Sequence, residues 1–183
     1  ETEAGADHLD RYSMRITSLA ELGEVYAQLK ADPSHGFSPI VIDTVDKLYD
    51  LVKAAVCAKL SIEDPSESPH GGAWGQINQK LENTISSFQA LGAGLWLLGH
   101  ERVAESGRVT PAMSAGAGSK VCDMVDVIGY VTVDAATDVR TVHFKPGRAY
   151  KAKARVRVGK GMPDCPLEWD AISEAYEEAQ SDS

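Results

Sequence analysis

The 183 residues, 43% hydrophobic and 25% charged, are typical of one soluble domain that buries roughly 70% of its unfolded surface. A formal net charge of −9 argues against a protein that coats nucleic acid by bulk positive charge, and three widely spaced cysteines without a C-x-x-C pair argue against a disulfide framework or a zinc site. No apolar run reaches the roughly 18 residues of a membrane span and no signal-peptide pattern opens the chain, so we expect a cytoplasmic protein without a membrane partner.

Helical and extended patterns alternate in the first part of the chain. The patterns predict, in order, a short strand at 12–17, a helix over 19–31 opened by a capping box, a strand at 40–43, a helix over 45–60, a Pro- and Gly-rich loop over 61–75, a helix over 77–91 and a strand at 95–98. Two buried strands separated by helices predict a β-α-β unit with a parallel sheet.

The second part of the chain is predicted to be more irregular. We expect a functional or mobile loop over 102–118, a short helix over 119–124, a hairpin of strands 125–134 and 139–145, an extended basic segment over 148–158 and a final helix from Trp169. Residues 1–167 are predicted to form the core, and residues 168–183 a C-terminal helix with an acidic tail.

Polar side chains stand at the predicted carboxyl ends of the strands. Asp43 ends the β-branched run at 40–43, His100 follows the strand at 95–98, and Glu3 lies in a Gly- and acid-rich opening typical of a loop that leaves a strand. Ligands of open α/β sheets bind outside these strand ends. Nucleotide hydrolysis needs a carboxylate for Mg²⁺, an acid that orients water and a neutral group that senses the γ-phosphate, and the three residue types fit these roles.

Structural interpretations stay open beside these roles. Asp43 can cap the following helix, His100 can end its strand on a backbone carbonyl, and Glu3 can be a solvated acid. Asp46 is interpreted as an N-terminal acid that favours the helix dipole. Trp74, in the Gly-rich loop, can stack on unpaired bases or pack back onto the core.

In order and spacing, several short motifs together resemble the RecA-like branch of P-loop ATPases, most closely the phage-encoded recombination ATPases associated with single-strand annealing. The motifs are the Thr2–Asp10 segment after the second core strand, the Walker B strand Ile40–Asp43, the first DNA-facing loop at Gly72–Gly75, the sensor strand Trp96–His100, the second DNA loop at Arg102–Ser119 and the basic turn from Arg155 to Pro163. The resemblance covers nearly the whole chain. It implies an α/β fold with a RecA-like three-layer core, a mostly parallel sheet and a C-terminal antiparallel hairpin.

The resemblance also implies a mechanism. Glu3 would align the attacking water, Asp43 would hold Mg²⁺ through its waters, and His100 would report the phosphate state of ATP. The implied contacts to single-stranded DNA are His70, Trp74, Arg102 and Arg108, and the implied inter-subunit or phosphate contacts are Arg155, Arg157 and Lys160, although this basic stretch also fits a solvated face. The implied partners are further copies of the chain in a ring or filament, with phage recombination or single-strand-binding proteins, in the cytoplasm of a bacterial host.

One departure from that family is the phosphate loop G-x-x-x-x-G-K-[ST], which is absent from the 183 residues. Two explanations stay open: the first strand and the phosphate loop lie upstream of Glu1, or ATP binding has been lost. We expect the first, because the chain begins without Met and in the middle of a motif. The alternatives are a nucleotide-free RecA-like module for binding or assembly, and an unrelated α/β enzyme with a carboxylate-bound metal.

Overall fold

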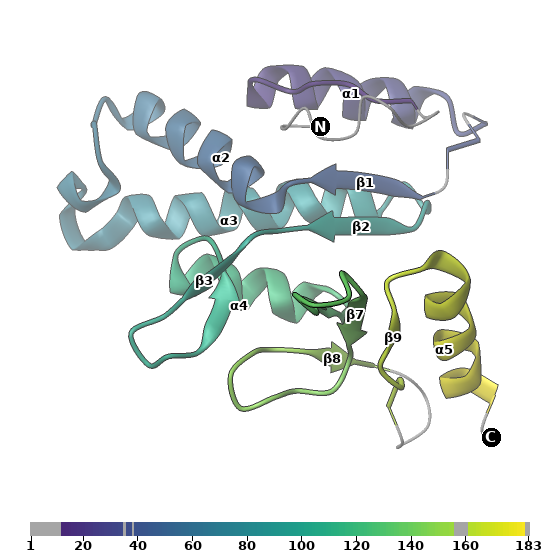
Figure 1. Ribbon diagram of the computed structural model, residues 1–183. Helices are drawn as coiled ribbons and strands as arrows, with labels where there is room; N and C mark the ends of the chain where they lie inside the picture. Colours follow the sequence, from purple (N-terminus) through teal and green to yellow (C-terminus); the bar gives the residue numbers. More distant parts are fainter. Residues whose placement is uncertain (1–11, 35, 38, 156–160, 182–183) are drawn as a thin grey trace. The chain divides into compact units, whose positions relative to one another are not determined.

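A computed structural model describes residues 12–34, 36–37, 39–155 and 161–181 (Figure 1). The chain divides into two compact units, one formed by Glu1–His100 with Pro111–Lys120 and the other by Glu101–Thr110 with Val121–Ser183. None of the helices in the described part of the chain is long and apolar enough to cross a membrane. The predicted boundary at residue 167 stays a prediction.

The first unit contains a parallel pair of strands among helices. Its elements are α1 (Leu19–Ala31), β1 (Ile40–Asp43), α2 (Val45–Leu60), the 3-10 turns η1 (Pro65–Glu67) and η2 (Pro69–Gly71), α3 (Gly72–Gln89) and β2 (Leu95–Leu98). In Figure 1, β1 and β2 are neighbouring arrows that point the same way, and their register joins Ile40 to Leu95 and Asp43 to Leu98. The predicted β-α-β unit is therefore present, and its two strands end together.

The core of the first unit lies mainly between α2 and α3, which pack against each other. Apolar residues recur along α3 with the spacing of one helix face, so Ile77, Leu81 and Ile85 are buried with at most 1% of their surface exposed. Val52 of α2 is fully buried as well. In contrast, α1 has no buried residue, although Ser18 caps it by accepting a hydrogen bond from the backbone N–H of Glu21.

The second unit is built from short strands and two helices. Its elements are β3 (Glu101–Val103), β4 (Val109–Pro111), α4 (Ala115–Met124), which runs through the division between the units, β5 (Val127–Ile128), β6 (Tyr130–Val133), β7 (Arg140–His143), β8 (Lys153–Ala154), β9 (Cys165–Pro166) and α5 (Trp169–Ser181). The largest sheet has the order β6-β7-β9, with antiparallel pairs. A small core joins this sheet to α5, and its buried members are Val142, Phe144, Met162, Ala175 and Ala179.

The sheet organisation differs from the prediction of one mostly parallel sheet. Among the described residues, β1 and β2 pair in parallel, whereas β5 with β8, β6 with β7 and β7 with β9 pair antiparallel in separate small sheets. The single strand expected over 125–134 is broken at Gly129. A Cβ atom there would lie 2.5 Å from Cγ1 of Val142, so the chain passes too close to the core for any side chain, and β5 leaves β6 to pair with β8.

Three local predictions were wrong. Residues 12–17 form no strand. The loop expected over 61–75 contains η1, η2 and the start of α3, because Pro65 and Pro69 occupy first helical positions, where the missing N–H costs nothing. The loop expected over 102–118 instead forms β3 and β4, joined through a turn at 104–108, and then the start of α4.

Candidate functional site

The carboxyl ends of β1 and β2 bring the central candidate residues to one edge of the parallel pair. Asp43 is the last residue of β1 and is half-buried, and His100 comes two positions after Leu98, the last residue of β2. The N-cap of α2 is Thr44, so Asp43 is not the cap of that helix. The helix-cap interpretation of Asp43 is therefore wrong, and its carboxylate stands at the strand edge where α/β sheets bind ligands.

Asp46 and His100 are in direct polar contact at this edge. Asp46 Oδ1 accepts a hydrogen bond from the backbone N–H of His100 at 3.0 Å, and Asp46 Oδ2 lies 3.0 Å from His100 Nδ1. The Asp46 side chain is 9% exposed and that of His100 is 55% exposed. Asp46 is thus more than an acid that favours the helix dipole, because its carboxylate ties the start of α2 to the end of β2.

The environment of Asp46 favours its ionised form. Burial on its own would raise the pKa of this carboxyl, but the hydrogen bonds from the side chain and backbone of His100 outweigh burial and hold the pKa below its ordinary value. An ionised carboxylate only accepts hydrogen bonds. His100 Nδ1 therefore carries the proton in this contact.

Gly99 allows the close approach of β2 to α2. A Cβ atom at this position would lie 3.1 Å from Cγ1 of Val45 and 3.7 Å from Oδ1 of Asp46. The glycine between the strand and His100 therefore leaves room for the Asp46 contact, which a larger residue would push apart.

The residues predicted to contact DNA are divided between the two units. His70 is exposed in η2, and Trp74 is half-buried in the first turn of α3 with the Lys53 ammonium 5.9 Å from its ring centre. Arg102 lies in β3 and Arg108 directly precedes β4, where its carbonyl accepts from Ala104 across the turn. Trp74 therefore lies on a helix, under a lysine, and not in the exposed loop that its Gly-rich surroundings predicted.

The basic residues of the second unit have a structural role at the end of α4. Lys153 Nζ donates to the carbonyl of Cys122 at 2.5 Å, and the Arg155 guanidinium donates to the carbonyl of Asp123 at 3.1 Å. Arg155 also lies 3.8 Å from the Asp126 carboxylate. Cations near the last carbonyls stabilise a helix C-terminus. Arg157, Lys160 and Glu3 lie outside the described residues.

A second polar cluster, formed by Thr132, His143 and Asp164, was not predicted from the sequence. His143 in β7 places Nε2 2.9 Å from the Thr132 hydroxyl of β6 and Nδ1 2.8 Å from Asp164 Oδ2. Asp164 Oδ1 also accepts from the backbone N–H of Phe144 at 3.1 Å. These contacts tie β6 and β7 to the segment before β9. No local spacing signals them, because the partners are brought together only by strand pairing.

The donor set at the strand ends fits a magnesium ion held with a nucleotide better than an ion held by protein alone. No group of three or more His, Cys, Asp or Glu side chains able to hold a metal occurs within the described residues. Mg²⁺ usually keeps several waters and takes one or two carboxylates together with substrate phosphates. Asp43 supplies one such carboxylate, at an edge where it is half-exposed.

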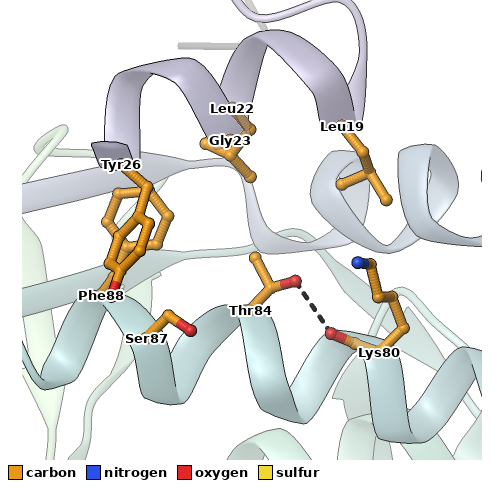
Figure 2. A pocket seen from close by; sticks show the side chains of 8 residues that line it. All are labelled: Leu19, Leu22, Gly23, Tyr26, Lys80, Thr84, Ser87 and Phe88. Carbon is orange, nitrogen blue, oxygen red and sulfur yellow. Dashed lines mark hydrogen bonds between the residues drawn. The ribbon is translucent and has the colours of Figure 1, made fainter. Parts of the chain in front are cut away.

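A shallow pocket lies elsewhere, between α1 and α3 (Figure 2). It measures about 110 Å³, and its lining is Leu19, Leu22, Gly23, Tyr26, Lys80, Thr84, Ser87 and Phe88. Ligand pockets usually measure roughly 300–1,000 Å³. The Thr84 hydroxyl in Figure 2 donates to the carbonyl of Lys80 in its own helix, and Tyr26 packs edge-on against Phe88. This hollow is a gap under the loosely packed α1, not a nucleotide site.

Comparison with known proteins gives the class of the chain. A family model described as an AAA domain matches residues 1–156. The chain therefore belongs to the AAA domain family, a family of P-loop type ATPases whose general activity is nucleotide binding and hydrolysis. No curated protein and no solved structure matches the chain.

Proposed function

We propose that this protein is a Mg²⁺-dependent ATPase of phage-type DNA recombination and single-strand annealing, which couples ATP hydrolysis to the binding of single-stranded DNA. The observation that carries the proposal is the edge of the parallel pair, where Asp43 ends β1 beside the end of β2 and His100 follows. Membership of the AAA domain family supports the nucleotide chemistry. The resemblance to RecA-like phage ATPases, with a three-layer core, supports the finer function.

Each residue has one task in the proposed reaction. Asp43 holds Mg²⁺ through water, Glu3 aligns the attacking water, and His100 contacts the γ-phosphate. Bound Mg²⁺ would neutralise charge that develops on the phosphate oxygens.

Covalent continuity supports a coupling between hydrolysis and DNA. Glu101, the next residue after His100, begins β3, and the β3–β4 hairpin carries Arg102 and Arg108. A change at His100 is therefore made directly before the hairpin that carries the two arginines proposed to track DNA phosphates. His70 and Trp74 in the first unit complete the proposed contacts, with Trp74 stacking on a base after Lys53 moves from its ring.

Assembly into a ring or filament is the last part of the proposal. In such an assembly, Arg157 and Lys160 would reach toward the nucleotide of a neighbouring subunit, and phage recombination or single-strand-binding proteins would be further partners. Arg155 would join them only by leaving the carbonyl of Asp123, to which it donates.

Ligand-dependent stability of the full-length protein tests this function. ATP with Mg²⁺ at about 100 times the dissociation constant should raise the free energy of unfolding by roughly 2.7 kcal/mol, and hydrolysis should accelerate when single-stranded DNA is added. Stabilisation by DNA without any effect of nucleotide would favour a binding or assembly module. Turnover of a phosphoester without ATP would favour an unrelated enzyme with a carboxylate-bound metal.

A further inference from the structure

Asp46 makes more contacts with a distant segment than a helix-terminal acid needs. An acid that only favours the dipole of α2 can stay in water, where the effect is about 0.3–1 kcal/mol. Asp46 instead is buried, and both of its carboxylate oxygens accept from His100, which lies 54 positions further along the chain. A carboxylate is costly to bury unless its hydrogen bonds are made, so this geometry depends on His100 being in place.

We propose that Asp46 is a positioning residue that fixes the His100 ring at the carboxyl end of β2, so that the imidazole meets the γ-phosphate of a bound nucleotide in one orientation. This inference rests on the proposed function and deepens it. Asp46 touches neither substrate nor metal in this scheme, and it acts through His100. The contact also assigns one ring nitrogen, because Nδ1 is the atom engaged with Asp46.

The backbone carbonyl of His100 is hydrogen-bonded as well, so the position of His100 also affects the segment that contains Ala112. This carbonyl accepts from the N–H of Ala112 at 2.9 Å. The chain leaves the first unit directly after His100 and re-enters it at Pro111. His100 is thus bonded both to the start of α2 and to the segment on which the β3–β4 hairpin returns. A displacement of His100 by the γ-phosphate would be passed to both ends of that hairpin.

The test uses the full-length protein with ¹⁵N-labelled histidine, four single variants and the double variant of Asp46→Ala with His100→Ala. Asp46→Ala removes both acceptor oxygens. Asp46→Asn keeps the shape of the side chain and one acceptor oxygen, and it replaces the alanine variant if that variant does not fold. Asp50→Ala is the matched control, since Asp50 lies one turn later on α2 with a side chain that is 64% exposed. The spectrum of His100→Ala is recorded first, because the imidazole signals that it lacks are those of His100.

The expected spectrum of the wild-type protein shows His100 protonated at Nδ1, even before nucleotide is added. In Asp46→Ala the His100 signals should move toward those of a solvent-exposed imidazole, and in Asp46→Asn they should move in part. Asp50→Ala should leave them unchanged. Unchanged His100 signals in Asp46→Ala would overturn the proposal, because the ring would then be held by other groups.

Nucleotide binding supplies the second readout. In Asp46→Ala and in His100→Ala, a non-hydrolysable ATP analogue should bind about tenfold more weakly, because the contact to the γ-phosphate is lost. The affinity for ADP, which has no γ-phosphate, should stay the same. The double variant should be no worse than His100→Ala, because both changes remove one contact. Additive losses would overturn the proposal. If the wild-type protein binds no nucleotide, the proposed function fails, and the spectra alone decide whether Asp46 positions His100.

Discussion

Asp43 and Leu98 are paired in the register of β1 and β2, and each is the last residue of its strand. Two parallel strands that end at the same level place whatever follows them at one edge of the sheet. Asp43 itself and His100, two residues after Leu98, therefore lie at the same edge of the strand pair although 57 positions separate them in the sequence. The first prediction depends on this shared edge.

Replacing Asp43 by Asn in the full-length protein should lower Mg²⁺-dependent ATP hydrolysis by on the order of 10²-fold or more, because the change removes the negative charge that holds the metal. The measurement is the hydrolysis rate as a function of Mg²⁺ concentration. Asp50→Asn on the exposed side of α2 is the control and should be unaffected. Equal rates for Asp43→Asn and the wild-type protein would remove Asp43 from the site.

The packing of α3 gives a second prediction. Ile77 of α3 is fully buried, so its truncation to Ala removes buried apolar atoms and leaves a cavity in the core. Ile77→Ala should lower the free energy of unfolding by about 2–5 kcal/mol, as measured by urea denaturation. Gln76→Ala, at the exposed neighbouring position, should change it by less than roughly 0.5 kcal/mol. Similar losses in both variants would contradict the described face of α3.

Two glycines form a matched pair for a third prediction. A Cβ at Gly129 would lie 2.5 Å from Cγ1 of Val142 and 3.2 Å from the Phe144 ring, whereas a Cβ at Gly75 would meet nothing within 4 Å. Gly129→Ala should therefore destabilise the protein by about 1–3 kcal/mol. Gly75→Ala, inside α3, should stabilise it by roughly 0.5–1 kcal/mol because alanine favours the helix. Thermal unfolding of both variants tests the two signs together.

The elements predicted correctly from the sequence are those with a strong local period. The helices over 19–31 and 45–60 and the strands at 40–43 and 95–98 have the predicted bounds, because their apolar spacing and flanking residues agree. The break at Gly129 has a different origin. It depends on the approach of Val142, which no pattern around residue 129 reveals. The prediction for 102–118 was wrong for a related reason, since β3 pairs with β4 across a turn and Val109 also pairs with Tyr150, far along the chain.

The candidate site shows the same division between local and distant information. The place of Asp43 at the end of β1 was predicted correctly because a β-branched run ends in a carboxylate, which is a local signal. The role of Asp46 was missed because helix-terminal acids are common and the partner, His100, is 54 positions away. The cluster of Thr132, His143 and Asp164 was missed as well, since strand pairing alone brings its members together.

Acid dependence of the second unit is the last prediction. Burial on its own would raise the pKa of Asp164, but hydrogen bonds from the His143 side chain and the Phe144 backbone outweigh it and hold the pKa below the ordinary value. Because the folded pKa is lowered, the stabilisation by Asp164 is present above the unfolded value of about 3.9 and is lost as the pH falls through the lower folded value. The Asp164 side chain is 40% exposed, so solvent screens the pair.

Asp164→Asn should therefore lower the free energy of unfolding by about 1 kcal/mol at neutral pH, and the difference from the wild-type protein should shrink below a pH of about 4. Urea denaturation at a series of pH values measures both. Asp138→Asn is the control, because Asp138 is exposed in the turn between β6 and β7 and asparagine tolerates its φ of 55°. A difference for Asp164→Asn that persists unchanged at acid pH would mean that shape, and not the ionised carboxylate, stabilises the junction of β7 with the segment before β9.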